Sequence, residues 1–239
     1  MSRTGIDRTL WPAVGTLALT FLLFEVTPLD LLVQNHLYDF AARRWLIDAH
    51  AAVPRALFYT GPKLVLITMG VALIALVVGP QSWRNRLHVP EPVRRNLLVA
   101  FLTLGTVPAF IGELKSVTNV FCPSEIRAYG GDQPYVRVLE RHSDSDRPTR
   151  CGHCFPAGHA SGGFALLGLV GLASSRRARV LTIVPGLAAG CIMGFYQMAK
   201  GAHFLSHTVV TALIAWILFL VWRRILRVTT PAAIGQTRP

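Results

Sequence analysis

Long apolar runs separated by polar loops dominate the pattern of this chain. The runs are Leu10–Val26, Leu64–Val78, Asn96–Ile111, Phe164–Ala173, Val180–Met198 and Phe204–Trp222. Several approach the roughly 20 residues that a helix needs to cross a bilayer. The second and fourth runs extend toward Phe58 and Pro156 through apolar or small residues. The pattern predicts an all-α, polytopic membrane bundle of about six transmembrane helices, with five as the alternative, in which residues 1–239 form one membrane domain.

The segment between the first two runs has a different pattern. In Leu29–Ala52, apolar residues alternate with acidic, basic and histidine side chains. A helix with one apolar and one charged face suits the boundary between lipid and water. We therefore expect an interfacial helix between the first and second spans.

Arginines in short loops predict the orientation of the bundle. Residues 79–95 and 174–179 are rich in arginine, and such loops remain on the cytoplasmic side. This assignment places both termini in the cytoplasm. Residues 27–62 and 112–155, together with the joint near Gly201, then lie on the opposite face.

Composition agrees with a membrane protein, since 52% of the residues are hydrophobic and only 15% are charged. The net charge of +12 raises the question of nucleic acid binding. Basic residues are spread over loops on both sides instead of forming one basic face, which argues against a nucleic-acid partner. Topology and anionic lipid head groups explain the charge better, so the bilayer is the expected partner. The pattern does not indicate an oligomeric state.

Three short segments with chemically useful side chains fall on the same predicted face. They are Lys115–Pro123 after the third run, Phe155–Ser161 at the start of the fourth, and Gln197–His207 at the start of the sixth. His159 and His203 are thus both expected at helix starts on one membrane surface. The segments predict a single site at the boundary between lipid and water.

The residue types in these segments suit phosphate chemistry. Histidine acts as a nucleophile or as a general acid and base near neutral pH. Residues Pro156–His159, with Gly158 among them, are expected at a helix N-terminus, where unpaired backbone N–H groups and the helix dipole favour a bound anion. Lys115 and Lys200 add positive charge for phosphate oxygens.

At these residues the chain resembles the type-2 phosphatidic acid phosphatase superfamily, membrane lipid phosphatases that share a fold with vanadium haloperoxidases. The family pattern is Lys-x6-Arg-Pro, then Pro-Ser-Gly-His, then Ser-Arg-x5-His-x3-Asp. The matching residues are Lys115 and Pro123, then Pro156, Gly158 and His159, then His203. The resemblance covers a catalytic core of about residues 102–222. It implies that His203 attacks phosphorus to form a phosphohistidine and that His159 protonates the leaving group and later activates water, with no metal or cofactor.

Four polar contacts expected from the family pattern are missing. Cys122 and Gln197 replace two phosphate-binding arginines, Ala157 replaces a serine, and His207 replaces the aspartate that orients the nucleophile. Substitute cations must come from other residues, and the candidates are Lys200, Arg127, Arg137, Arg150 and His153.

His203 needs an orienting partner in place of the missing aspartate. His207 is four residues away, on the same face of a helix, where a neutral ring could hold the His203 tautomer. The sequence contains no Asp or Glu after Asp146. Glu113 and Glu125 are therefore the candidates for an orienting acid.

Three cysteines lie in the loops expected on the non-cytoplasmic face. An oxidising compartment favours a disulfide among Cys122, Cys151 and Cys154, with the pairing left open. The spacing of Cys151 and Cys154 also allows a zinc site or a redox motif. A second cysteine pair and a thioredoxin-like βαβ context are both missing, so neither is preferred.

The expected function is a lipid phosphatase in the bacterial inner membrane, with its site facing the periplasm; the bacterial origin is implied by the resemblance. Candidate substrates are undecaprenyl pyrophosphate, lipid A phosphates and phosphatidylglycerol phosphate. Transfer of the phosphoryl group to a second lipid is one alternative. The other is a binder or transporter of lipid phosphates without catalysis.

Overall fold

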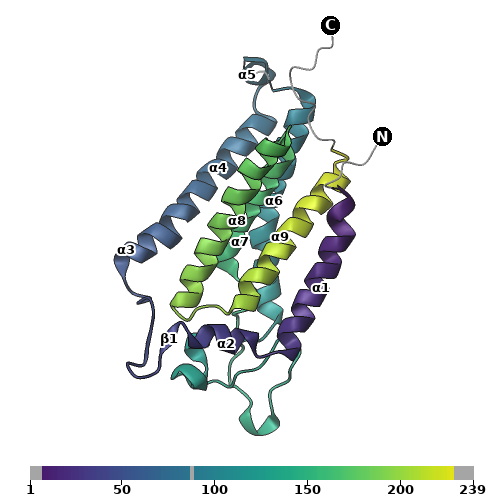
Figure 1. Cartoon of the computed structure of the whole chain (residues 1–239). Helices are drawn as coiled ribbons and strands as arrows, with labels where there is room; N and C mark the ends of the chain where they lie inside the picture. The colour runs from purple at the N-terminus through teal and green to yellow at the C-terminus, as the bar shows by residue number, and fades with distance from the viewer. Residues whose placement is uncertain (1–6, 87–88, 229–239) are drawn as a thin grey trace.

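The computed structural model describes residues 7–86 and 89–228 as a bundle of long helices with loops gathered at its two ends (Figure 1). The long helices of the bundle are α1 (Leu10–Val26), α4 (Gly61–Val78), α6 (Glu91–Val117), α8 (Arg176–Ala199) and α9 (Leu205–Ile225). Between α6 and α8 lies α7 (Gly158–Ala165), which continues as a 3-10 helix over Leu166–Leu172. The prediction of a mainly helical membrane bundle is confirmed.

The predicted count of six spanning helices is not confirmed among the described residues. Four helices are long and apolar enough to cross a membrane, at Ala52–Val78, Glu91–Val117, Arg176–Ala199 and Leu205–Ile225. A fifth span results if α1 and the short α2 (Leu29–Asn35) are counted together across their 71° bend. Within the described residues, the chain is therefore a multi-pass membrane protein with four or five spans by this measure.

The fourth predicted span is a short helix enclosed by the others. Gly158–Leu172 is too short to count as a span. Its conversion to the 3-10 form, which rises about 2.0 Å per residue instead of 1.5 Å, brings its length to about 26 Å. Most of its side chains are buried against neighbouring helices. A helix enclosed by protein does not need a lipid-facing surface as long as the bilayer.

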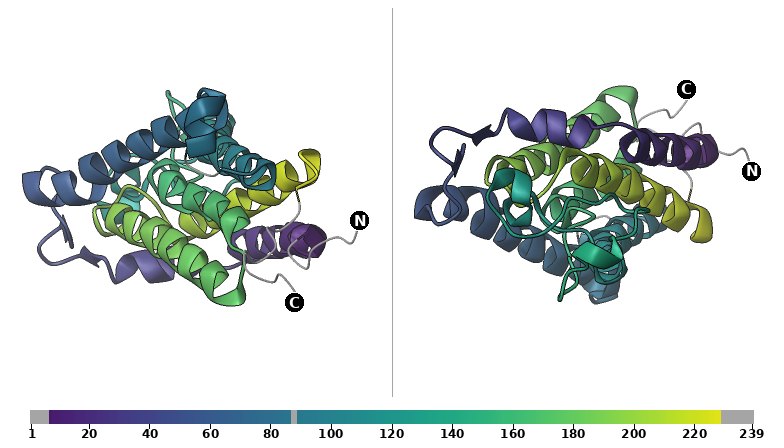
Figure 2. Two further views of the ribbon diagram at one scale, coloured as in Figure 1. Left: turned by 90° about the horizontal axis from the view of Figure 1, so that it is seen from above. Right: turned by 90° about the horizontal axis from the view of Figure 1, so that it is seen from below.

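Small residues let α8 pack closely on two neighbours. A Cβ atom on Gly190 would lie 2.2 Å from the Phe164 ring of α7, and one on Gly194 would lie 2.4 Å from Thr208 of α9. Side chains at these positions would push the helices apart. The close approach holds α7 between α8 and α9, which Figure 2 shows from both ends of the bundle.

The interfacial segment is helical for only part of its predicted length. After α2, the strands β1 (Tyr38–Asp39) and β2 (Arg44–Trp45) form a small antiparallel hairpin. The Asp39 carboxylate accepts hydrogen bonds from the backbone of Ala41 and Ala42, a turn that competes with helix. The prediction of a helix through Ala52 is therefore wrong. The short α3 (Ala52–Arg55) then leads into α4.

The loops group at the two ends as the arginine pattern predicted. In Figure 1, α5 (Gln81–Arg86), the start of α1 and the end of α9 lie at one end of the bundle. α2, β1 and the long loop between α6 and α7 lie at the opposite end. All three motif segments are thus carried to the same end.

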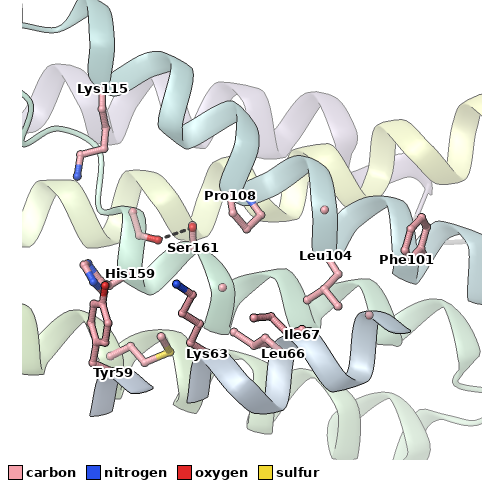
Figure 3. Close-up of a pocket in the computed structure, with 15 residues that line it drawn as sticks. Tyr59, Lys63, Leu66, Ile67, Phe101, Leu104, Pro108, Lys115, His159 and Ser161 are labelled. Atoms are coloured by element: carbon pink, nitrogen blue, oxygen red, sulfur yellow. Dashed lines mark hydrogen bonds between the residues drawn. The ribbon is translucent and has the colours of Figure 1, made fainter. Parts of the chain in front are cut away.

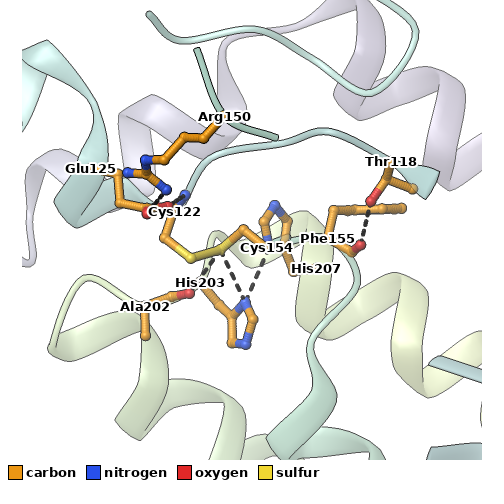
Figure 4. Close-up of a disulfide and its surroundings, with 9 residues drawn as sticks. All are labelled: Thr118, Cys122, Glu125, Arg150, Cys154, Phe155, Ala202, His203 and His207. Atoms are coloured by element: carbon orange, nitrogen blue, oxygen red, sulfur yellow. Dashed lines mark hydrogen bonds and ion pairs between the residues drawn. A yellow bond between two sulfur atoms is a disulfide. The ribbon is translucent and has the colours of Figure 1, made fainter. Parts of the chain in front are cut away.

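A disulfide fastens the long loop to the start of α7. Cys122 and Cys154 are bonded, whereas Cys151 is an exposed free thiol (Figure 4). The backbone N–H of Cys154 also donates to Val120 O at 2.9 Å. Of the pairings that the sequence left open, the structure contains Cys122–Cys154, which joins the first motif segment to the second.

Loss of this bond should destabilise the protein, because a cross-link between residues 32 positions apart restricts the unfolded chain. Cys122→Ser and Cys154→Ser should each lower the free energy of unfolding by about 2–4 kcal/mol, seen as a lower melting temperature in detergent. Cys151→Ser and Cys191→Ser are the matched controls and should melt like the wild type. Equal melting of all four variants would contradict the bond.

Candidate active site

Two buried imidazoles stand where the chain enters α9. Gly201 has a φ of 76°, which turns the backbone from α8 toward α9. His203 lies just before the helix and His207 in its first turn, with only 3% and 2% of their surfaces exposed. Their Nδ1 atoms are 3.2 Å apart, as Figure 4 shows. The contact that the i, i+4 spacing predicted is present, although His203 precedes the helix.

The pair determines which nitrogen of His203 is available for chemistry. When Nδ1 of His203 carries the proton, its N–H donates a hydrogen bond to Nδ1 of His207. The lone pair on Nε2 of His203 is then free. Burial, reinforced by the positive charges of His207 and Lys115, lowers the pKa of His203 well below its usual value. The neutral ring is therefore the favoured form. A neutral imidazole with a free Nε2 is suited to nucleophilic attack.

A carboxylate from a distant segment caps α9 beside this pair. The buried Asp30 of α2 accepts hydrogen bonds from the backbone N–H of Ser206, at 2.8 Å, and from its hydroxyl. The N-cap residue of α9, Phe204, has no side chain that could do this. Asp30 thus holds the turn that carries both histidines. Asp30 and Ser206 are 176 positions apart, and no motif in the sequence indicated their contact.

The start of α7 is attached to the same turn. The backbone N–H of Ala157 donates to Thr211 Oγ1 at 3.0 Å and to His207 O at 3.2 Å. On the other side, Thr118 Oγ1 donates to Phe155 O at 2.6 Å, which anchors this segment to the end of α6. These bonds place His159 of α7 at a fixed position relative to the His203–His207 pair.

His159 and Lys115 line one end of a pocket between α4, α6 and α7 (Figure 3). The pocket has a volume of about 510 Å³. Lys115 approaches the first residue of α7, since its Nζ would lie 3.5 Å from a Cβ atom on Gly158. The lysine, the histidine and the opening N–H groups of α7 thus surround one position suited to an anion. The remaining walls are mainly apolar, with Leu66, Ile67, Phe101, Leu104 and Pro108 among them.

Helix α4 and the turn before it contribute two residues that the motifs did not reveal. The Tyr59 ring packs against the His159 ring with centroids 4.6 Å apart and the planes tilted by 44°, and Lys63 of α4 lines the same pocket. Tyr59 belongs to a π-helical turn, Ala56–Thr60, that precedes Pro62. Proline lacks a backbone N–H, which favours such a local change of helical pitch. α4 lies outside every motif segment, and the only signal for Lys63 was the rarity of lysine in this chain.

Four site candidates do not line the pocket: His203, His207, Gln197 and Lys200. Gln197 is 1% exposed, and its side-chain nitrogen has no hydrogen-bond partner among the described residues. The Lys200 ammonium lies 5.0 Å from the centroid of the Tyr196 ring and acts electrostatically on His159. Gln197 and Lys200 belong to the third motif segment, which lies next to the first and second motif segments in the structure.

Other predicted residues are occupied elsewhere. Arg127 pairs with Asp146 in the long loop, where Nη1 is 2.6 Å from Oδ2. Glu125 accepts the backbone N–H of Cys122 and pairs with Arg150, and Glu113 is exposed on α6. The structure therefore does not bring Arg127, Glu125 or Glu113 to His203. Among the described residues, Nδ1 of His203 contacts His207 Nδ1 and Cys154 Sγ, and not a carboxylate.

A metal site would require a change in the disulfide. Possible ligand atoms of Cys154, His203 and His207 lie within 4.8 Å of one another. The Cys154 sulfur is bonded to Cys122, and only a thiolate is a good zinc ligand. Cys151 remains outside this cluster, so the zinc site considered for Cys151 and Cys154 is not formed.

Removal of the Asp30 cap should loosen the start of α9, because the Ser206 N–H would be left buried without a partner. Asp30→Ala should lower the free energy of unfolding by about 1–2 kcal/mol, measured by thermal denaturation in detergent. Asp144→Ala removes an exposed carboxylate of the long loop and serves as the control. Equal melting temperatures for the two variants would contradict the proposed role of Asp30.

Comparison with known families agrees with this geometry. The family model of the PAP2 superfamily matches residues 96–230, which include Lys115, His159 and His203. Searches of curated proteins and of solved structures found no match. The resemblance noted in the sequence is confirmed over more than half of the chain. The chain therefore belongs to the PAP2 superfamily, whose members are phosphatases.

Proposed function

We propose that this protein is a lipid phosphatase, which removes a phosphate group from a lipid phosphate or pyrophosphate. The observation that carries the proposal is the pocket itself, which joins a cationic end to largely apolar walls. A phosphate ester without a lipid chain would not require such walls, whereas an amphiphile matches both parts.

The dimensions of the pocket support an amphiphilic substrate. Its lining residues on α6 extend from Lys115 back to Phe101, a distance of about 21 Å along a helix. Half of the hydrocarbon core of a bilayer is about 15 Å thick. A lipid with its head group at Lys115 would thus keep its chain against apolar side chains throughout one leaflet.

In the proposed complex, the phosphate lies between Lys115 and the start of α7. The Lys115 ammonium and the opening N–H groups of α7, including that of Gly158, bind the non-bridging oxygens. His159 lies at the same end of the pocket and faces the leaving oxygen. No cofactor is required in this scheme, since charge on the phosphate is met by the lysine and the helix N-terminus.

The proposed reaction has two steps. Nε2 of His203 attacks phosphorus and forms a P–N bond, while the bond to the leaving oxygen breaks and His159 gives that oxygen a proton. Water then attacks the phosphohistidine, His159 takes a proton from the water, and the P–N bond breaks. Inorganic phosphate leaves, and His203 and His159 return to their starting states. His207 holds the Nδ1 proton of His203 throughout.

The surroundings of the site support its location at the outer face of a bacterial inner membrane. The long loop at the site end carries the Cys122–Cys154 disulfide, which persists in an oxidising compartment such as the periplasm. The arginine-rich short loops belong to the opposite end of the bundle, as expected for the cytoplasmic side.

Replacement of either proposed catalytic histidine should abolish turnover. In detergent micelles, His159→Ala and His203→Ala should lower kcat by about a thousandfold or more, because general acid catalysis and the nucleophile are lost. His50→Ala, at an exposed position, is the control. Phosphate release would be measured with undecaprenyl pyrophosphate, phosphatidylglycerol phosphate and lipid A as substrates. Wild-type turnover by either alanine variant would refute the assignment.

The same panel distinguishes hydrolysis from the alternatives. Inorganic phosphate should appear whether or not a second lipid is present. Phosphate that moves to an added acceptor lipid without release would identify a phosphotransferase. Binding of the lipids without release or transfer would identify a non-catalytic binder or transporter.

A further inference from the structure

Lysine is rare in this chain and is concentrated at one place. The sequence contains 21 arginines and three lysines, Lys63, Lys115 and Lys200. These three come from α4, from α6 and from the joint after α8, yet each is a charged neighbour of His159. Every lysine of the chain is thus associated with a proposed catalytic residue, whereas the arginines are spread over the loops.

Lys63 and Lys115 face each other across the pocket. Lys115 extends from α6 and Lys63 from the opposite wall, on α4, and in Figure 3 both side chains reach toward α7. The residues of α4 that line the pocket are Lys63, Leu66, Ile67 and Gly70. Their positions i, i+3, i+4 and i+7 define a single helical face. Tyr59, in the π-helical turn that precedes α4, lines the same pocket and packs against His159.

Lys63 is exposed and also forms part of the pocket wall. A lysine near the end of a spanning helix commonly directs its ammonium to the water at the membrane surface. Lys63 lines the pocket together with His159, so the same ammonium is also available to a ligand in the pocket.

In the part of the chain that the structure describes, no lysine forms an ion pair with an acidic side chain. The ion pairs found among the described residues all involve arginine: Arg94 and Arg95 with Glu91, Arg127 with Asp146, and Arg150 with Glu125. Several ammonium groups near one another repel and are stabilised by a bound anion. The group of lysines therefore resembles an anion-binding site whose positive charges are neutralised by the bound ligand.

The number of extra lysines matches the number of lost arginines. Cys122 and Gln197 stand where the family pattern has two phosphate-binding arginines, so two positive charges are absent. Lys63 and Lys200 supply two charges beyond that of Lys115. Lys200 belongs to the third motif segment, but Lys63 lies outside residues 96–230, which the family model matches.

We propose that Lys63 is a substrate-binding residue whose ammonium binds a phosphoryl oxygen together with Lys115, so that α4 completes the head-group site. The inference rests on the proposed function only in taking the phosphoryl group to be that of a lipid. It makes α4 both a wall for the lipid chain and a ligand for the head group.

Binding of inorganic phosphate to the purified full chain in detergent tests this role directly. The titration is made at 0.15 M salt, where charges separated by more than about 8 Å are largely screened. Lys63→Gln should weaken the affinity about tenfold, and Lys63→Arg should retain most of it. Arg147→Gln removes one charge from an exposed loop position that does not line the pocket, and should bind like the wild type. Circular dichroism and melting temperature check that each variant is folded.

Phosphate release from the lipid panel, measured on the same samples, separates this inference from the proposed function. Weakened phosphate binding by Lys63→Gln together with a wild type that hydrolyses no lipid phosphate would support Lys63 and refute the lipid phosphatase. Wild-type affinity and an unchanged KM in Lys63→Gln would refute the role of Lys63, whatever the activity. A KM raised about tenfold in Lys63→Gln, with Lys63→Arg close to the wild type, would support it. A wild type that neither binds phosphate nor hydrolyses lipid phosphates would overturn both proposals.

Discussion

The contact between two imidazoles removed from water, His203 and His207, is the interaction on which the site depends. A buried polar group needs a partner, and the pair provides one for each ring through the 3.2 Å contact of their Nδ1 atoms. The surrounding structure keeps the two rings in place. Asp30 caps the helix that carries His207, and the disulfide places Cys154 Sγ 3.5 Å from His203 Nδ1. One nitrogen of His203 is thereby occupied, and the other is left for chemistry.

The same end of the bundle must also admit a lipid substrate from the membrane. A site for a lipid must bind a charged group and an apolar chain within a short distance. The pocket does so between α4, α6 and α7, with lysines at one end and apolar side chains along the helices. α7 is short and enclosed, so its start lies inside the bundle and not in the lipid. The helix dipole at that start can then act on a phosphate in a partly desolvated site.

The parts of the fold and of the site that depend on local sequence patterns could be predicted. The apolar runs predicted the helices, and the spacing of His203 and His207 predicted their contact. The length of α7 could not be predicted, because Leu166–Leu172 is as apolar as a spanning helix and its 3-10 form appears only in the packed bundle. The interfacial helix was overestimated because alternating charges resemble an amphipathic helix, whereas Asp39 folds the chain into a turn.

The missed parts of the site are contacts between distant segments. Asp30 binds Ser206, 176 positions later in the sequence, and the Tyr59 ring contacts the ring of His159 on a different helix. No local motif contains either pair. Arg127 was a reasonable substitute for a lost arginine by charge alone. Its carboxylate partner, Asp146, lies 19 residues later in the same loop, and only the folded loop shows that they pair.

The central claim is that His203 is the nucleophile, and trapping the covalent intermediate tests it most directly. The wild type would be mixed with a lipid phosphate labelled at phosphorus and quenched in alkali within milliseconds, and the labelled peptide would be identified by mass spectrometry. The account predicts label on His203, in a peptide that yields no label when the same experiment uses His203→Ala. Label on His159, His207 or a hydroxyl side chain, or rapid turnover with no covalent phosphate at all, would contradict it.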